Sequence, residues 1–223
     1  MRRFLAILLC AAMLAVPVRA AEETKYAVLT FDDGPSGRFT RRLLDCLKER
    51  DVKSTFLLCG YRIKDYSNEA QRIFDEGHEI GIHGYSHKSM CSMSQEEVAR
   101  EIQDTAALLP AGCSPVFMRP PGGMCSDAVY EAVRAAGLAV LTWSVDPKDW
   151  ATRDTSAIVN MVVSNTQDGD VILLHDMSDS SVTAALQIID QLQAKGFRFV
   201  TASQLAQIKG TQCQAGEVYC DFD

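Results

Sequence analysis

The most constraining feature of the sequence is a series of short apolar segments that recur from residue 25 onward. Seven segments are nearly continuous in apolar residues: YAVLTF, STFLLC, EIGIH, VFMRP, AVLTWSV, DVILLHD and FRFVT. Strands that are covered on both faces have this character. Amphipathic segments with helical periodicity lie between them. This alternation predicts an α/β fold with a parallel sheet, either open or closed into a barrel.

Helix signals support this alternation. They are the four-residue spacing of Phe39, Leu43 and Leu47, the capping-box pair Ser94 and Glu97, and the C-cap glycines Gly137 and Gly196. No linker or repeat divides the chain. We therefore expect one folded domain over residues 21–209, followed by a short tail over residues 210–223.

The first twenty residues have the layout of a secretory signal. Arg2 and Arg3 precede an apolar run over residues 4–16, and a small-residue cleavage site ends at Ala20. The run is too short to span a bilayer comfortably. We expect an exported, secreted or wall-associated protein without stable membrane insertion.

The negative net charge of the sequence argues against certain binding partners. Removal of the first twenty residues takes away three arginines and no acids, which moves the formal charge from −7 to −10. An acidic protein without a basic run is poorly suited to nucleic acid or to anionic lipid. We expect a monomer that binds no nucleic acid.

The cysteines predict disulfides rather than a metal site. Eight cysteines become seven once Cys10 is removed, and an odd number in an oxidising compartment leaves one thiol unpaired within the chain. We predict a disulfide between Cys213 and Cys220, and proximity of Cys91 and Cys125. No CxxC motif occurs, so the cysteines are not expected to bind metal.

Polar residues interrupt the apolar pattern at the C-terminal ends of the predicted strands. They are Asp32, Asp33, His83, His87, Arg119, Asp146, Asp149, Trp150 and His175. In a parallel α/β fold these ends meet on one face, where catalytic groups collect. The sequence therefore predicts one site built from distant segments. His78 precedes its strand at the opposite end of the sheet, and we interpret it as structural.

Two histidines and two aspartates in this set predict a catalytic metal. His83 and His87, four residues apart, together with one carboxylate form the ligand type of catalytic zinc. An isolated HxxxH pattern more often marks two ordinary loop histidines. The neighbouring Asp32–Asp33 pair favours the metal, because one carboxylate can bind a cation while the other accepts a proton from water that the cation activates.

Three further residues complete the predicted chemistry. Arg119 is the natural bidentate partner of the free carboxylate. His175 could act as an acid that protonates a leaving amine. Asp146 could hold that imidazole protonated, although Asp146 taken alone is more typical of a loop acid or a helix N-cap.

The site residues lie in five segments that resemble the motifs of the polysaccharide deacetylases of the NodB-homology group, carbohydrate esterase family 4. The segments are TFDDGP at 30–35, HGYSH at 83–87, RPPGG at 119–123, DPKDW at 146–150 and LLH at 173–175. The resemblance implies a distorted (β/α)7 barrel in a single domain. It also implies metal-assisted hydrolysis of N-acetyl groups on a β-1,4-linked amino sugar, with release of acetate.

The resemblance assigns roles to particular residues. Four are implied in catalysis: the base Asp32, the acid His175, Arg119, which positions Asp32, and Asp146, which tunes His175. Three are implied as ligands of a divalent metal, usually zinc or cobalt: Asp33, His83 and His87. Four are implied in substrate binding: Pro121, Gly122, Trp150 and Leu173. In the family, the metal and a backbone N–H of the third motif hold the oxyanion.

Two positions depart from the family pattern. The family usually has Ser or Thr at the position of Gly84, where the hydroxyl helps to fix the loop between the metal histidines. It usually has an aromatic residue at the position of Gly122, so we expect a more open groove here. Neither change removes a reacting group.

The expected activity is N-deacetylation of an amino-sugar polymer, with the N-acetylglucosamine of peptidoglycan as the first substrate. Acetylated xylan, chitin oligomers and muramic residues are alternative substrates of the same chemistry. A non-catalytic glycan-binding protein with this fold would need neither Asp32 nor His175. A hydrolase of small cyclic amides would be expected to have altered acid–base groups.

Overall fold

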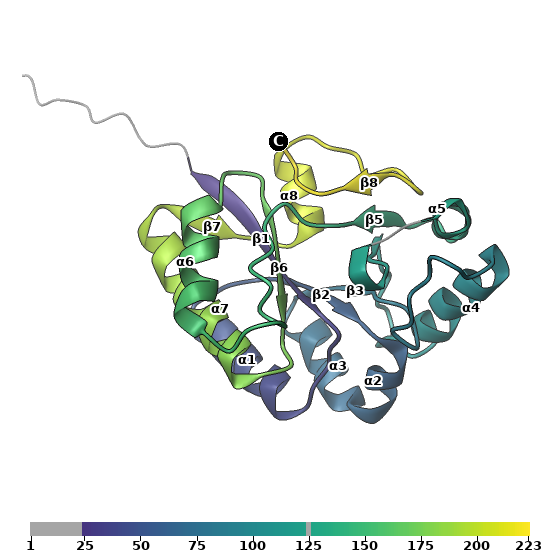
Figure 1. Cartoon of the computed structure of the whole chain (residues 1–223), viewed down its shortest axis with the longest axis horizontal. Coiled ribbons are helices and arrows are strands. Elements are labelled where there is room, and N and C mark those ends of the chain that lie inside the picture. The colour runs from purple at the N-terminus through teal and green to yellow at the C-terminus, as the bar shows by residue number, and fades with distance from the viewer. Residues whose placement is uncertain (1–23, 124–125) are drawn as a thin grey trace, which may run out of the picture.

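A curled parallel sheet organises the part of the chain that the computed structural model describes, residues 24–123 and 126–223 (Figure 1). The strands are β1 (Lys25–Asp32), β2 (Thr55–Leu58), β3 (Glu79–Ile82), β4 (Phe117–Met118), β5 (Ala139–Leu141), β6 (Val171–His175), β7 (Phe197–Phe199) and β8 (Val218–Tyr219). Their order is β6-β1-β2-β3-β4-β5-β8, and β7 pairs with the beginning of β1. The predicted single-domain, distorted (β/α)7 barrel is confirmed as a curled half-barrel of parallel strands.

Helices cover the outside of this sheet. They are α1 (Arg38–Glu49), α2 (Gly60–Asp65), α3 (Ser67–Asp75), α4 (Gln95–Ala106), α5 (Asp127–Ala135), α6 (Thr155–Asn165), α7 (Asp179–Ala194) and α8 (Ala202–Ile208), with a 3₁₀ turn η1 at Pro121–Gly123. In Figure 1, α1, α6 and α7 lie on one side and α2, α3 and α4 on the other. None of the helices in the described residues is long and apolar enough to cross a bilayer.

The central strand β1 sets the position of the site. Its residues from Ala27 onward are buried, because β2 and β6 pair with its two edges and hydrophobic core clusters cover both of its faces. The parallel register pairs Asp32, the last residue of β1, with His175, the last residue of β6. Two predicted functional residues that are far apart in sequence therefore lie side by side at one end of the sheet.

The local helix predictions agree with the structure. Ser94 and Glu97 form the predicted capping box of α4. Gly137 and Gly196 follow α5 and α7 with φ values of 73° and 87°, which a residue with a Cβ rarely adopts. His78 is buried at the other end of the sheet and accepts a hydrogen bond from the backbone N–H of Ser54, at 3.2 Å. This contact supports a structural role.

The tail differs from the prediction. Cys213 and Cys220 are free thiols, so the predicted disulfide between them is wrong. Cys213 is half-buried, whereas Cys220 is exposed and its thiol donates to Asp221 at 3.0 Å. The tail is held instead by the backbone pairing of β8 with β5 and by the buried side chain of Phe222. Hydrophobic burial and strand hydrogen bonds thus replace the expected covalent bond.

Several predictions concern residues outside the described ranges. The signal segment over residues 1–20 and Cys125 belong to this group. Cys91 is an exposed free thiol. Its predicted proximity to Cys125 therefore stays a prediction.

Candidate active site

Asp32 lies at the bottom of the site, where a buried arginine holds its carboxylate. Arg119 follows β4, has no exposed surface, and donates from Nη1 to Asp32 Oδ1 at 2.6 Å. The same guanidinium donates to the carbonyls of Leu141 and Thr142, at 2.7 and 2.6 Å, and to Thr30 Oγ1 at 2.8 Å. These bonds satisfy a cation that burial would otherwise make costly. They also fix the orientation of one carboxylate oxygen of Asp32.

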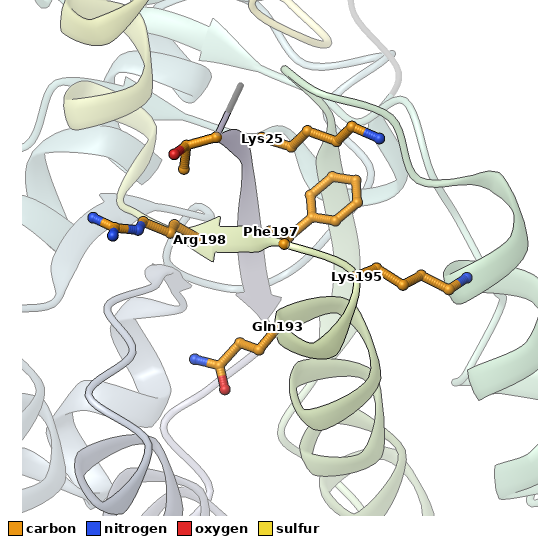
Figure 2. A pocket seen from close by; sticks show the side chains of 7 residues that line it. Lys25, Gln193, Lys195, Phe197 and Arg198 are labelled. Atoms are coloured by element: carbon orange, nitrogen blue, oxygen red, sulfur yellow. The ribbon is translucent and has the colours of Figure 1, made fainter. Parts of the chain in front are cut away.

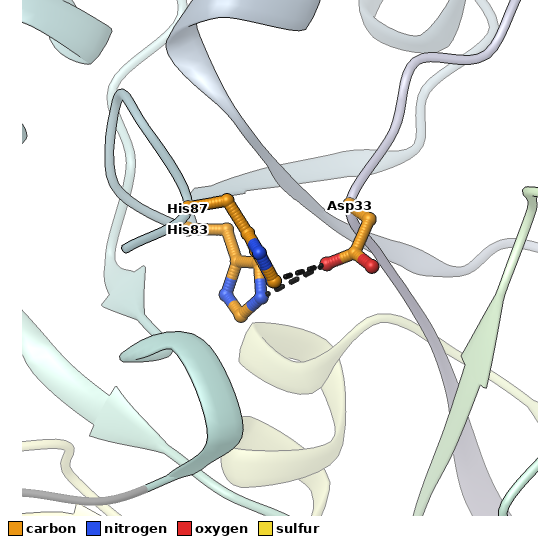
Figure 3. Close-up of side chains that lie close together, drawn as sticks. All are labelled: Asp33, His83 and His87. Atoms are coloured by element: carbon orange, nitrogen blue, oxygen red, sulfur yellow. Dashed lines mark ion pairs between the residues drawn. The ribbon is translucent and has the colours of Figure 1, made fainter. Parts of the chain in front are cut away.

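Asp33, His83 and His87 converge as the sequence predicted (Figure 3). Asp33 Oδ1 lies 3.2 Å from His83 Nε2 and 2.9 Å from His87 Nε2. One candidate ligand atom from each residue lies within 4.8 Å of the others. Asp33 and His87 have φ values of 70° and 57°, a strained region for residues with side chains. The turns that follow β1 and β3 are thus bent to bring these ligands together.

The electrostatics of this cluster suit a cation. Burial favours the neutral form of Asp33, but the adjacent imidazoles of His83 and His87 hold the pKa of this carboxyl well below its usual range. His83 Nδ1 lies 2.6 Å from the carbonyl oxygen of Arg119, which can only accept a hydrogen bond. This contact keeps a proton on Nδ1, so that a neutral His83 would present its Nε2 lone pair to a cation, as in many metal-binding histidines. A carboxylate and two imidazoles oriented in this way fit zinc or cobalt.

A glutamate on α4 fixes the loop between the two histidines. The carboxylate of Glu101 accepts hydrogen bonds from the backbone N–H groups of Tyr85 and Ser86, at 2.7 and 2.8 Å, and from the Ser86 hydroxyl at 2.8 Å. Gly84 has a φ of 76°, and a Cβ there would lie 2.5 Å from the terminal methyl carbon of Met90. The loop is therefore anchored from α4 without a hydroxyl at position 84. The sequence prediction missed Glu101, because an ordinary helix glutamate gives no signal of its own.

His175 pairs with Asp149, not with Asp146. Its Nδ1 lies 2.7 Å from Asp149 Oδ1, and its backbone N–H donates to Asp149 Oδ2 at 2.9 Å. Burial opposes the charged imidazolium, but the hydrogen bond and the charge of Asp149 prevail and raise the pKa of His175 to about 9. The imidazole is thus held protonated at neutral pH, and its Nε2 has no hydrogen-bond partner among the residues that the structure describes.

The predicted tuning role of Asp146 is wrong for a local reason. Asp146 Oδ1 accepts the backbone N–H of Lys148, at 2.8 Å, in a turn of the aspartate type. The alternative interpretation of Asp146 as a loop acid was therefore correct. Asp149 was already among the polar residues at this strand end, and its complete burial next to the exposed Trp150 distinguishes it from Asp146.

A buried carboxyl group connects the turn after β1 to the end of β6. Thr40 donates to the side chain of Asp176, and Ser36 donates to its backbone carbonyl. A Cβ at Gly34 would lie 2.6 Å from Asp176 Oδ1, so only glycine allows this approach. Burial raises the pKa of Asp176 to about 6. Sequence analysis missed this connection, although Asp176 directly follows His175.

The site opens into a cavity of about 390 Å³. The residues that line it are Asp32, Asp33, His83, His87, Gly122, Trp143, Asp146, Trp150, Leu173 and His175. Trp143 was not predicted, and Pro121 is buried without being part of this lining in the described ranges. A Cβ at Gly122 would meet nothing within 4 Å, which agrees with the expected open groove.

Comparison with known proteins assigns this site to a family. The sequence profile described as polysaccharide deacetylase matches residues 19–141, more than half of the chain. The chain belongs to the polysaccharide deacetylase family. It is accordingly a hydrolase, and the resemblance inferred from the five motifs is confirmed.

Two curated relatives of this deacetylase act on peptidoglycan. The peptidoglycan-N-acetylglucosamine deacetylase of Bacillus cereus is 36% identical over 191 residues, which cover 83% of this chain and 90% of that protein. The peptidoglycan-N-acetylmuramic acid deacetylase PdaC of Bacillus subtilis is 36% identical over 187 residues, which cover 83% of this chain but 39% of that protein. The deacetylase thus spans most of the first relative and less than half of the second.

A solved structure supports the fold assignment. The family 4 acetyl xylan esterase of Clostridium thermocellum, solved in complex with a cobalt ion, superimposes with a TM-score of 0.81 and is 32% identical. The match covers 88% of this deacetylase and 98% of that chain. A metal ion in a relative of the same fold agrees with the ligand geometry of Asp33, His83 and His87.

A separate cavity of about 530 Å³ lies at the opposite end of β1 of this deacetylase (Figure 2). Lys25, Lys195 and Arg198 are among its lining residues. In Figure 2 the side chains of Lys195 and Arg198 point away from each other. These cations do not converge, in contrast to the groups at the candidate active site.

Proposed function

We propose that this polysaccharide deacetylase is an exported, metal-dependent enzyme that removes N-acetyl groups from an amino-sugar polymer. The proposed substrate is the N-acetylglucosamine of peptidoglycan, as in the relative from Bacillus cereus. One observation carries the proposal: a cluster of Asp33, His83 and His87 shares a cavity with Asp32 and His175, two groups suited to proton transfer that are not part of the cluster.

The metal would be bound by Asp33, His83 and His87, with zinc as the first candidate and cobalt as the second. A bound divalent cation supplies Lewis acidity, which polarises the amide carbonyl and lowers the pKa of water. The three protein ligands leave coordination positions for substrate and water, as catalytic zinc sites require.

Asp32 is the proposed general base. Arg119 occupies Oδ1, so Oδ2, which lies 3.7 Å from His83 Nε2, remains to accept a proton beside the metal ligands. The buried ion pair with Arg119 also fixes the carboxylate in one orientation, and such positioning is a large part of catalysis. Asp32 is therefore placed to act on a water molecule at the edge of the cluster.

His175 is the proposed general acid, and Asp149 takes the supporting role first expected of Asp146. At neutral pH the imidazole carries a proton, because its pKa is raised to about 9. The register of β1 and β6 places His175 across from Asp32, so a scissile amide between them can be attacked on one side and protonated on its nitrogen from the other. The backbone near Gly122, which lines the same cavity, is the proposed donor to the oxyanion.

The location in the cell is also part of the proposal. The three-part pattern of residues 1–20 supports export, and a polymer of the cell wall would be accessible to an exported enzyme. A non-catalytic glycan-binding protein is disfavoured, because binding alone requires neither the Arg119–Asp32 pair nor the Asp149–His175 pair.

Two variants at adjacent positions test the assignment. Asp32→Asn should abolish acetate release while metal content, measured by atomic emission on the purified protein, stays near that of the wild type. Asp33→Asn should lose both, because it removes a ligand. Equal loss of metal in the two variants would show that the roles of base and ligand are assigned incorrectly.

A further inference from the structure

A second cavity, of about 260 Å³, adjoins the catalytic cavity. Its lining residues are Asp33, Asp149, Trp150, Ala151, Thr152, Arg153, His175, Met177, Ser178, Ser180 and Ser181. Three of them, Asp33, Trp150 and His175, also line the catalytic cavity. The two cavities therefore meet at the reacting groups, and Trp150, which is 67% exposed, lines both.

The adjoining cavity contains a cation without a partner. Arg153 is exposed, and no ion pair or hydrogen bond of its guanidinium occurs with any residue in the described ranges. Nearby acids are already engaged: Asp149 binds His175, and Asp154 caps α6 by accepting the backbone N–H of Ala157 at 3.0 Å. The guanidinium is thus available to a ligand.

The rest of the lining also suits an anionic oxygen ligand. Ser178 is the N-cap of α7, a helix of 16 residues, and Ser180 and Ser181 lie in its first turn, so the amino end of this helix faces the cavity. The helix dipole favours negative charge at such an end, where the Ser178 hydroxyl already accepts the backbone N–H of Ser181 at 3.1 Å. Asp179 in this turn is directed to Arg38 and Arg42, at 3.8 and 3.3 Å, and is partly neutralised.

The negative net charge of the chain gives a local cation such as Arg153 a role in binding an acidic polymer. The chain has a formal charge of −7, so its general field opposes the approach of an acidic polymer. A planar guanidinium beside the site can offset this repulsion by binding a carboxylate through two parallel hydrogen bonds. A neutral polymer would gain no charge–charge attraction from such a group.

We propose that the adjoining cavity is a subsite for the sugar next to the one that is deacetylated, and that Arg153 selects a carboxylate-bearing substituent on that sugar. This inference rests on the proposed function and narrows its substrate class. The favoured polymer alternates amino sugars with sugars that carry an acidic 3-O-substituent, such as a lactyl ether. Neutral chitin oligomers and acetylated xylan lack this group.

Paired substrates test the proposal. The first is chitotetraose, which is neutral, and the second is a tetrasaccharide of the same length with free 3-O-lactyl carboxylates on alternate sugars. The ratio of kcat/KM for the acidic substrate to that for the neutral one is measured by acetate release from zinc-loaded enzyme. Arg153→Gln should lower this ratio about fivefold, the size of a well-placed exposed ion pair. Arg153→Lys should retain part of the preference.

Arg198→Gln is the matched control, because Arg198 is an exposed arginine that lines the cavity at the opposite end of β1. It should have the wild-type ratio. Higher ionic strength should reduce the wild-type preference and leave the Arg153→Gln ratio nearly constant. Equal losses on both substrates, or a wild-type ratio in Arg153→Gln, would overturn the proposal.

A binding measurement separates this inference from the proposed function. If the wild type releases acetate from neither substrate, the proposed function fails. Calorimetric dissociation constants for the two tetrasaccharides then decide the inference, with the zinc-loaded wild type and Arg153→Gln compared. A fivefold weaker preference for the acidic tetrasaccharide in the variant supports it, and identical preferences contradict it.

Discussion

The two sides of the active-site cavity are built in different ways. One side, the buried wall, consists of Asp32, His83 and Arg119, all nearly inaccessible to water. The other side, the open rim, consists of Gly122 and Trp150 together with Arg153 of the adjoining cavity, all exposed. The buried wall follows directly from the ends of β1, β3 and β4, whereas the open rim lies on connecting segments.

This difference separates chemistry from recognition. Residues of the buried wall contact one another and the backbone, so their geometry is set before any substrate arrives, which lowers the cost of reaching the transition state. Residues of the open rim have few partners and can change without loss of the fold. Substrate preference within the family is therefore expected to vary at the rim while the wall is retained.

The largest effect is expected at the centre of the buried wall. Arg119→Met keeps the side-chain length but leaves the carboxylate of Asp32 and two backbone carbonyls without their donor. Removal of one partner of a buried ion pair costs about 3–5 kcal/mol, so the free energy of unfolding should fall by this amount. Urea unfolding monitored by circular dichroism measures it, and acetate release should be lost as well.

An exposed arginine provides the comparison for this variant. Arg134 pairs with Glu131 on the surface of α5, and Arg134→Met should cost less than about 1 kcal/mol. If both variants were equally stable, Arg119 would not be the structural centre of the site.

The second largest effect is expected at the proposed general acid, His175, which lies between the buried wall and the open rim. Asp149→Asn removes the charge that raises the pKa of His175, so the imidazole should lose its proton at lower pH. A general acid must be protonated, and kcat/KM should therefore fall as pH rises through this pKa. That decline should begin near pH 9 in the wild type and at lower pH in the variant. At pH 8 the rate should drop about 10²-fold, within the range for general acid catalysis.

Asp146→Asn is the control for this effect. Asp146 lines the same cavity but binds its own turn, so its variant should keep the alkaline limit of the wild type and lose far less activity. A shift of the alkaline limit in Asp146→Asn, with none in Asp149→Asn, would restore the first assignment from the sequence.

These two aspartates also show where prediction from sequence ends. Alternating apolar segments predicted the parallel sheet, and the strand ends predicted the convergence of Asp32, His83 and His175, because strand direction and register carry that information. The choice between Asp146 and Asp149 depends on how one turn closes, and both residues follow the same strand. Neither the hydrophobic periodicity of the sequence nor the spacing of its polar residues predicts the conformation of this turn.

The C-terminal tail and α4 also have contacts that the sequence did not predict. Cys213 and Cys220 have the spacing of a small disulfide loop, but strand pairing and burial of Phe222 hold the tail without it. Glu101 lies on a helix with ordinary amphipathic spacing, and only the approach of α4 to the loop after β3 gives it a role. Contacts between separate elements depend on packing, which a local pattern does not encode.

The smallest effect is expected at the loop that carries the exposed metal ligand. His87 is 40% exposed and lacks the buried support of His83, so its position depends on the hydrogen bonds of Glu101. Glu101→Gln keeps the shape but removes the negative charge that accepts the backbone N–H groups of Tyr85 and Ser86, and it places an NH2 group where Oε1 accepted the Ser86 hydroxyl. Zinc affinity, measured by competition with a chromophoric chelator, should fall about tenfold, as is typical when a residue that supports metal ligands is altered.

Glu97→Gln on the same helix separates this effect from a general weakening of α4. Glu97 belongs to the exposed capping box, where glutamine can also accept the hydrogen bond from Ser94, so zinc affinity should stay at the wild-type level. Equal affinity in Glu101→Gln and Glu97→Gln would mean that the turn geometry alone holds His87. In that case the position of the exposed ligand His87 would not depend on the hydrogen bonds of Glu101. The contrast between the buried wall and the open rim would then not extend to metal binding.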